Sequence, residues 1–281
     1  MNRALDMISL RVLPVSARFS MPDFATGATR FDEQRSFPEA IGAELRDIVL
    51  ARVPGGPQAW LLETGIGTGR IAAPFAAAGC RYTGLDSSPA MLARCRGRFG
   101  KAAGPRADLV LGDMRRLPFP DGRFDAVLAA SVYRVAAPWQ MAAAEASRVL
   151  ARPGVICLMK HVVASGSMEH VLAERKREIL ASLGAGRYPE GGASDEEVAG
   201  FFAERGATVE RIETAAWNTT ATPRACLARY LRGSRVAITP YAEPLRRELE
   251  AFAVKQYASL DIEEEVARTM RVLIIGLAAR S

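Results

Sequence analysis

Three glycines follow a short apolar run in the segment LLETGIGTGRIAAPFAAAG, residues 61–79. Gly65, Gly67 and Gly69 leave the backbone bare before a helix of small residues, where free N–H groups and missing Cβ atoms let a ligand approach closely. Glu63 stands just before the first glycine, and its carboxylate would repel a diphosphate but attract a cation. The segment therefore favours a positively charged ligand, with an amino group or a sulfonium, over a nucleotide phosphate.

The order of the glycines argues against two common nucleotide sites. A nucleotide-triphosphate loop requires Gly-Lys-Ser/Thr, whereas Arg70 follows Gly69. A dinucleotide fingerprint requires Gly-x-Gly-x-x-Gly, whereas the third glycine comes one position early here. A nicotinamide-dependent oxidoreductase is thus the weaker alternative from another enzyme class, and it would leave Glu63 and Asp113 without a role.

Acids also end the next two apolar runs. Asp86 closes RYTGLD (81–86), and Asp113 follows ADLVLG (107–112). Because ligands of open α/β sheets bind at the carboxyl ends of the strands, we expect these acids and the glycines to meet at one edge. There Asp86 can accept hydrogen bonds from both hydroxyls of a ribose. Asp113 can accept one from an adenine amino group, with Met114 packed on the ring.

The elements that must position these residues alternate between apolar runs and helical patterns from residue 59 to about 160. Continuous apolar strands separated by helices indicate a parallel sheet covered on both faces. With right-handed crossovers they predict an α/β fold, a doubly wound and mostly parallel sheet of seven strands with helical lid insertions. The expected strands are 59–63, 81–86, 107–112, 124–130, 154–160, 207–213 and 272–279. The expected helices are 36–56, 69–78, 89–98, 138–150, 166–184 and 194–206.

We expect one domain with three parts. Residues 1–56 form an N-terminal helical segment that could cover the ligand, and residues 57–164 form the ligand-binding α/β core. Residues 165–281 complete the sheet and carry a helical substrate lid. The lid is inferred because the helical pattern from 222 to about 270 is too long for a simple connection between two strands.

Four segments together resemble a known family: LLETGIGTGRIAAPFAAAG, YTGLDSSPAMLARCR, LVLGDMRRLPFPDGRFDAVLAA and EASRVLARPG. In their order and spacing they resemble the class I S-adenosylmethionine-dependent methyltransferases, specifically the ubiquinone-biosynthesis-like group that acts on small molecules. The resemblance covers roughly residues 31–160, and FDEQRSFP (31–38) resembles the segment that closes over the cofactor. It implies a Rossmann-like methyltransferase fold and S-adenosyl-L-methionine as the cofactor.

The resemblance also assigns residues to the cofactor. Asp86 would take the ribose hydroxyls, Met91 and Met114 would flank adenine, and Ser131 would offer backbone groups to the amine of the cofactor. The glycines and the acid before them would hold the methionine moiety. The residues expected to bind the cofactor are Glu63, Gly65, Gly67, Gly69, Asp86, Ser87, Met91, Asp113, Met114 and Ser131.

The sequence carries no strong catalytic signature, and methyl transfer does not demand one. Aligning an acceptor with a sulfonium methyl group can contribute ~7–11 kcal/mol without covalent help. His161, at the end of the fifth expected strand, is a candidate base. Tyr133 and Arg134 follow the fourth strand, and Arg134 could bind a substrate carboxylate or phosphate. Relatives often carry histidines where ASVYRV (130–135) has Ser131 and Arg134, so the identity of the base stays open.

Charge and composition limit the classes of substrate and partner that we expect. The net charge is +6 and the isoelectric point about 9.4, but basic residues pair with acids three or four positions away, as in 173–180 and 243–250. Nucleic acid is therefore not expected, although an RNA-directed methyltransferase remains an alternative. The lid-sized insertions after the fifth and sixth strands favour a small-molecule substrate, because an enclosed pocket suits one. A cofactor-binding protein of this fold repurposed for non-methylating chemistry, such as cyclisation, is another.

The remaining features favour a cytoplasmic protein. The four cysteines show no Cys-x-x-Cys pairing, so we expect buried free thiols and no metal site. No apolar run approaches the ~20 residues of a membrane span, and the first residues lack a clear secretion signal.

Overall fold

The computed structural model describes residues 10–12, 36–102, 107–185, 192–231 and 241–278. Two compact units make up the chain. The core unit comprises Met1–Lys160, Glu190–Thr214 and Arg271–Ser281, and the insertion unit comprises His161–Pro189 and Ala215–Met270. Residues 31–35 of the expected cofactor-closing segment lie outside the described residues.

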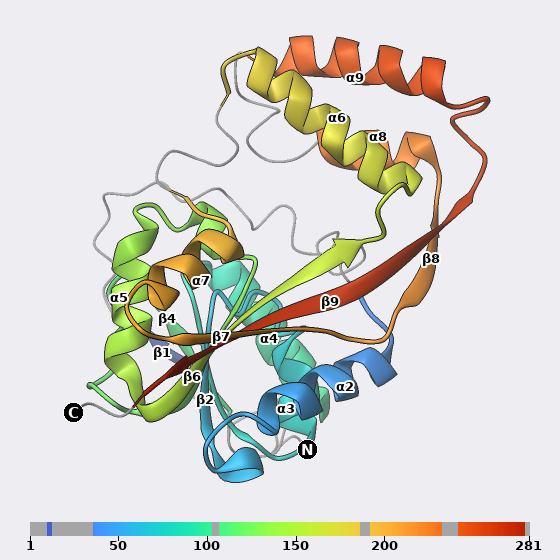
Figure 1. The fold of residues 1–281 in the computed structure, drawn as a ribbon. Coiled ribbons are helices and arrows are strands. Elements are labelled where there is room, and N and C mark those ends of the chain that lie inside the picture. The colour runs from blue at the N-terminus through green and yellow to red at the C-terminus, as the bar shows by residue number, and fades with distance from the viewer. Residues whose placement is uncertain (1–9, 13–35, 103–106, 186–191, 232–240, 279–281) are drawn as a thin grey trace. The chain divides into compact units, whose positions relative to one another are not determined.

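The strands follow the order β1-β4-β3-β2-β5-β6-β9-β7, with β8 paired to β9 (Figure 1). The pairs from β1 to β6 are parallel, whereas β7 and β8 pair antiparallel with β9. This confirms the doubly wound, mostly parallel sheet. The strands are β1 (Leu10–Val12), β2 (Trp60–Thr64), β3 (Arg81–Asp86), β4 (Ala107–Leu111), β5 (Phe124–Ala130), β6 (Leu150–Val163), β7 (Thr208–Glu213), β8 (Trp217–Ala221) and β9 (Glu264–Leu277).

The prediction of seven strands was wrong, because the described sheet has nine. β1 has three residues, too few for a hydrophobic period, and β8 (WNTTA) is largely polar. The helical pattern predicted up to residue 270 was also wrong, since β9 already begins at Glu264. Its first half alternates buried and more exposed residues, as a strand with one open face does.

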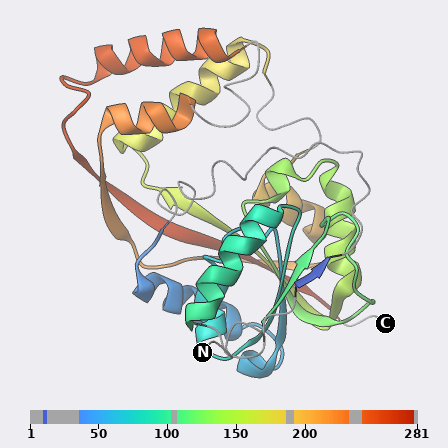
Figure 2. The same ribbon diagram turned by 180° about the vertical axis from the view of Figure 1, so that it is seen from behind.

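The insertion unit is built from three helices and the strands that lead into them (Figures 1 and 2). Its helices are α6 (Met168–Ser182), α8 (Pro223–Leu231) and α9 (Ala242–Gln256). Leu172, Leu227 and Leu249 form part of a buried apolar cluster between them. Glu169 is buried in this unit and pairs with both Arg229 and Arg268. The unit therefore has its own core, and two of its four boundaries with the core unit fall inside strands, in β6 and β9.

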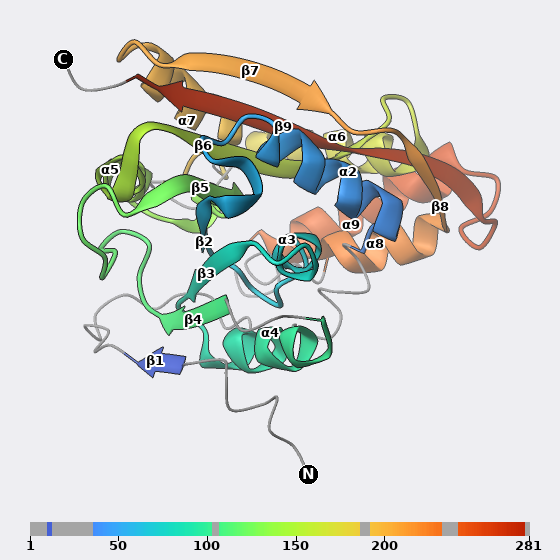
Figure 3. The same cartoon turned by 90° about the horizontal axis from the view of Figure 1, so that it is seen from below.

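Five helices cover the two faces of the core sheet (Figure 3). Helices α2, α3 and α4 lie on one face, and α5 and α7 lie on the other. Helix α7 begins with a capping box, in which Ser194 accepts from Glu197 N and the Glu197 side chain accepts from Ser194 N. The bounds are α2 (Glu39–Leu50), α3 (Ala72–Ala77), α4 (Pro89–Ala102), α5 (Trp139–Val149) and α7 (Asp195–Ala203).

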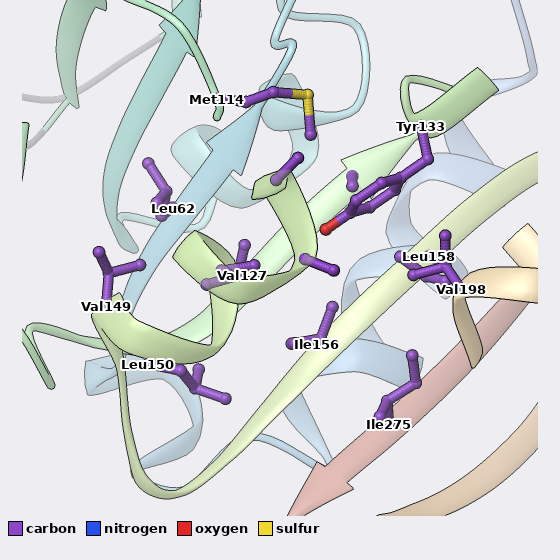
Figure 4. Packing of buried hydrophobic residues seen from close by; sticks show 14 of the residues in the cluster. Leu62, Met114, Val127, Tyr133, Val149, Leu150, Ile156, Leu158, Val198 and Ile275 are labelled. Carbon is purple, nitrogen blue, oxygen red and sulfur yellow. The ribbon is translucent and has the colours of Figure 1, made fainter. Parts of the chain in front are cut away.

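Apolar side chains fill the space between the core sheet and the α5–α7 layer (Figure 4). Val127 and Ile156, from the adjacent strands β5 and β6, are fully buried there, with Val149 of α5 and Val198 of α7. Both faces of the central strands are covered, which explains why their sequences read as continuous apolar runs.

Two further expectations concern the whole chain. All four cysteines are buried and free, as predicted: Cys80, Cys95, Cys157 and Cys226. No helix in the described ranges is both long and apolar enough to cross a membrane.

Candidate functional site

The glycine segment forms a tight turn between β2 and α3. Gly65, Gly67 and Gly69 have φ angles of +70°, +56° and +77°, in the left-handed region that glycine tolerates. A Cβ atom on Gly65 would lie 2.5 Å from Val132 Cγ2, and one on Gly69 would lie 2.6 Å from Cys95 Sγ. A Cβ atom on Gly67 would meet nothing within 4 Å. The outer glycines therefore permit packing within the protein, and Gly67 is the one open to a ligand.

Glu63 is 1% exposed at the end of β2, and Tyr82 Oη donates a hydrogen bond of 2.8 Å to its Oε2. Burial raises the pKa of Glu63 to about 8, against the lowering effects of the Tyr82 hydrogen bond and the charge of Arg70. A cationic ligand would stabilise the charged form of such a buried acid more than a neutral ligand would. The sequence analysis missed Tyr82, whose place in RYTGLD carries no sign of its partner.

Asp86 ties the end of β3 to the glycine turn. Its Oδ2 accepts from Gly67 N at 2.8 Å, and its Oδ1 accepts from Ser88 N at 2.9 Å. Burial raises the pKa of Asp86, and hydrogen bonds from the backbone of Ser88, Gly67 and Ser87 oppose that rise. The expected meeting of Asp86 with the glycines at one strand edge is thus observed.

Asp113 follows β4 and is held by an arginine that the sequence analysis did not assign. Arg115 Nη2 donates to Asp113 Oδ2 at 2.6 Å, and Arg115 Nε donates to both carboxylate oxygens at 3.0 Å. Burial acts to raise the pKa of Asp113, but the hydrogen bonds and the positive charge of Arg115 outweigh it. The pKa of Asp113 therefore lies below the usual aspartate range. Asp113 is therefore an ionised acceptor in a fixed orientation. The two methionines expected at adenine, Met91 and Met114, are both buried.

Ser131 makes a sharp bend where β5 ends. Its φ of +54° is the only positive value at a non-glycine residue in the described part of the chain. Ser131 N donates to Met159 O at 3.0 Å, and Arg134 Nε donates to Ser131 O at 3.1 Å. Val132 then packs over Gly65, so the bend brings the end of β5 to the glycine turn. Backbone strain of this kind is found where surrounding contacts enforce it, often at functional sites.

The three candidates for chemistry lie in different settings. Tyr133 is fully buried, its ring lies in the apolar cluster (Figure 4), and its hydroxyl has no hydrogen-bond partner among the described residues. Arg134 is half-buried in the short 3-10 helix η3 (Tyr133–Val135). His161 opens the insertion unit, where its ring packs edge to face on Trp217 with centroids 5.5 Å apart. Their roles stay predictions.

The described residues of the core unit thus bring a buried acid, an open glycine and two strand-end aspartates to one edge. This donor set fits a nucleoside that carries a positive charge. No group of three His, Cys, Asp or Glu side chains in the described part of the chain could hold a metal ion.

Comparison with known proteins places the chain in a family. Residues 62–158 match the methyltransferase domain family. A demethylmenaquinone methyltransferase of Thermus thermophilus is 32% identical over 161 residues, covering 53% of this chain and 71% of that protein. A ubiquinone/menaquinone biosynthesis C-methyltransferase of Methylobacterium nodulans is 39% identical over 131 residues, covering 44% of this chain and 51% of that protein.

Solved structures agree on the fold. A crystal structure of a putative methyltransferase from Bacillus halodurans superposes with a TM-score of 0.57 at 16% identity, covering 85% of this chain and 100% of that one.

The chain belongs to the class I S-adenosylmethionine-dependent methyltransferases, of the ubiquinone and menaquinone biosynthesis type. This confirms the resemblance. The chain spans only about half the length of the Methylobacterium relative, and the Thermus match covers about half of this chain.

Proposed function

We propose that this protein transfers a methyl group from S-adenosylmethionine to a small-molecule acceptor. The observation that carries the proposal is the arrangement of three residues around one turn. Glu63 is a buried acid, Gly67 leaves its Cβ position open, and Asp86 ends the neighbouring strand with its carboxylate at the Gly67 amide. When bound, S-adenosylmethionine supplies a methyl group on a positively charged sulfur, which is a good leaving group.

The residues of this chain would bind and align the cofactor. Glu63 would face its positive charge, Asp86 would accept from the ribose hydroxyls, and Asp113, oriented by Arg115, would accept from the adenine amino group. Ser131 would offer its bent backbone to the amine. Because the reaction is an in-line displacement, alignment and exclusion of water are the main tasks, and alignment can contribute ~7–11 kcal/mol.

Recognition of the acceptor is proposed for the insertion unit, as the expected lid. The match to the methyltransferase domain ends at residue 158, just before this unit begins at His161. A part that lies outside the common domain is where members of one family can differ in substrate, since fold alone does not set function.

Calorimetry tests cofactor binding directly. S-adenosylmethionine and S-adenosylhomocysteine should both bind, with NADH as the negative control. Asp86→Ala should weaken binding tenfold or more, because it removes the carboxylate at the glycine turn. Asp108→Ala is the matched control, since Asp108 is exposed on β4. Binding of NADH without binding of either sulfur compound would overturn the proposal.

Transfer itself is tested with a tritiated methyl group and acceptors of three kinds. The panel would hold a short-chain demethylmenaquinol, a phenol and a primary amine, with a structured RNA as the alternative. Labelling of RNA that falls steeply with salt would favour the RNA-directed enzyme. Tight cofactor binding without labelling of any acceptor would favour a repurposed, non-methylating protein.

A further inference from the structure

Asp195 is an acid on the buried face of a helix. It is the first residue of α7, and with Val198, Ala199 and Phe202 it forms the stripe that faces the core. The whole residue is 8% exposed. The helix dipole normally stabilises an ionised acid in the first turn, where the acid remains in water. Burial instead destabilises its charged form. The position of Asp195 therefore has a cost that its local structure does not explain.

The start of α7 is fastened to the end of β5. Ala193 N donates to Tyr133 O at 3.3 Å, which joins the residues before α7 to η3. Because η3 follows β5 after two residues, Asp195 lies near the carboxyl ends of the parallel strands. Ligands of open α/β sheets bind at this edge.

Charged groups from three other elements lie near the start of α7. Lys160, on β6, lies on the same face as Ile156 and Leu158, and its Nζ donates to Glu196 Oε1 at 2.5 Å. Arg134 lies on η3, and Glu196 also pairs with Arg271 of β9 at 3.5 Å. The positive charges of Lys160 and Arg134 act on Asp195, and Glu196 opposes them. Two cations thus act on the Asp195 carboxylate, at the edge where an acceptor would bind.

One buried polar group remains unsatisfied here. The Tyr133 hydroxyl has no hydrogen-bond partner in the described part of the chain. The charge of Asp195 acts on that hydroxyl and, together with burial, raises the pKa of Tyr133. Buried polar groups are nearly always paired, so such exceptions call for an explanation.

Burial is the main influence on Asp195 and raises its pKa to about 6; Glu196 adds to the rise, and Lys160 and Arg134 oppose it. A proton acceptor works best when its pKa lies near the working pH. An ordinary surface aspartate would be a much weaker base.

We propose that Asp195 takes the proton that the methyl acceptor releases. The inference rests on the proposed methyl transfer. The proton moves to the Asp195 carboxylate, and the electron pair left on the acceptor bonds to the methyl carbon. The carbon–sulfur bond breaks with its pair remaining on sulfur. Lys160 and Arg134 stabilise the negative charge that develops on the acceptor.

A first experiment does not depend on turnover. Protein labelled with carboxyl-¹³C aspartate is titrated by NMR, and Asp195→Asn identifies the resonance. The Asp195 carboxyl should titrate near pH 6, and its resonance should shift when a short-chain demethylmenaquinol is added with S-adenosylhomocysteine. The Asp108 resonance should not shift. A midpoint below about pH 4.5, or a resonance unmoved by the quinol, overturns the inference.

A second experiment measures the reaction with the same quinol. Asp195→Asn should lower kcat at least a hundredfold and abolish the acidic limb of the pH profile, while the Kd for S-adenosylmethionine stays within twofold. Asp195→Glu should recover part of the rate, and Asp108→Asn should match the parent. If the parent methylates the quinol and Asp195→Asn stays within threefold of it, the inference fails and the proposed function stands. Failure of the parent to bind S-adenosylmethionine would instead refute the proposed function.

Discussion

The hydroxyl of Tyr82 donates a hydrogen bond to a carboxyl oxygen of Glu63 across the β2–β3 pair, with an O···O distance of 2.8 Å. Both side chains are fully enclosed, and burial raises the pKa of each. With a pKa of about 8, Glu63 holds a proton at neutral pH in the free protein. Glu63 is therefore a neutral acid that can become an anion when a cation arrives.

Binding of the cofactor should release a proton from Glu63. At pH 7 a nearby positive charge favours the carboxylate, so about one proton should leave per cofactor bound. Calorimetry in phosphate and in Tris, whose ionisation enthalpies differ, measures this number. In Glu63→Gln the dependence on the buffer should vanish and the affinity should fall. Equal binding enthalpies in both buffers for the parent protein would contradict the prediction.

Substitutions at two glycines of the turn should affect thermal stability and cofactor binding differently. Gly65→Ala places its Cβ atom 2.5 Å from Val132 Cγ2, so it should lower the melting temperature clearly. Gly67→Ala meets no atom within 4 Å and carries only the left-handed backbone strain of about 1–2 kcal/mol. It should fold yet bind S-adenosylmethionine at least tenfold more weakly. Thermal unfolding and calorimetry on the two variants test this, and equal behaviour in both measurements would contradict it.

Asp195 should make stability depend on pH. Its folded pKa of about 6 lies above the ordinary aspartate value of 3.8, so the folded protein holds its proton more tightly. The stabilisation is complete below about pH 4 and is lost as the pH rises through 6. Asp195→Asn should therefore match the parent at pH 4 and be up to about 3 kcal/mol more stable at pH 8. Urea unfolding at the two pH values gives the difference, and an equal effect at both would refute the assignment.

His161 and Asp195 compete for the role of base, and paired variants decide between them. If Asp195 accepts the proton, His161→Ala should change kcat much less than Asp195→Asn, with cofactor affinity unchanged in both. The reverse order would restore His161, the base expected from the sequence. The measurement is kcat and cofactor Kd for both variants under one set of conditions.

Glu169 should stabilise the insertion unit. It is buried and pairs with Arg229 and Arg268, so Glu169→Gln leaves two partly buried cations without their counter-ion. Removal of one partner from such a cluster costs about 3–5 kcal/mol. Hydrogen exchange should accelerate in α6 and α8. Glu250→Gln, at an exposed position of α9, is the control and should leave exchange unchanged.

Much of the core unit was predictable because its signals are local. The glycine turn, the acids at the ends of β3 and β4, and the apolar runs of the parallel strands each lie within a few residues of sequence. Five central strands were placed within a few residues of their ends, except that β6 extends further at both ends. Two strands outside this centre were not predictable, because β1 is too short and β8 too polar to show a period.

The sequence by itself thus determined the order of the central strands and of the helices between them, the glycine turn and the family. Only the tertiary structure decided which groups meet: Tyr82 with Glu63, Arg115 with Asp113, and the backbone of Ala193, just before α7, with that of Tyr133. Asp195 shows the reason. In DEEV it reads as a solvated acid at a helix start, and its burial follows from packing α7 against strands distant in sequence. Periodicity reports which face of an element is apolar, whereas desolvation depends on what the fold places against it.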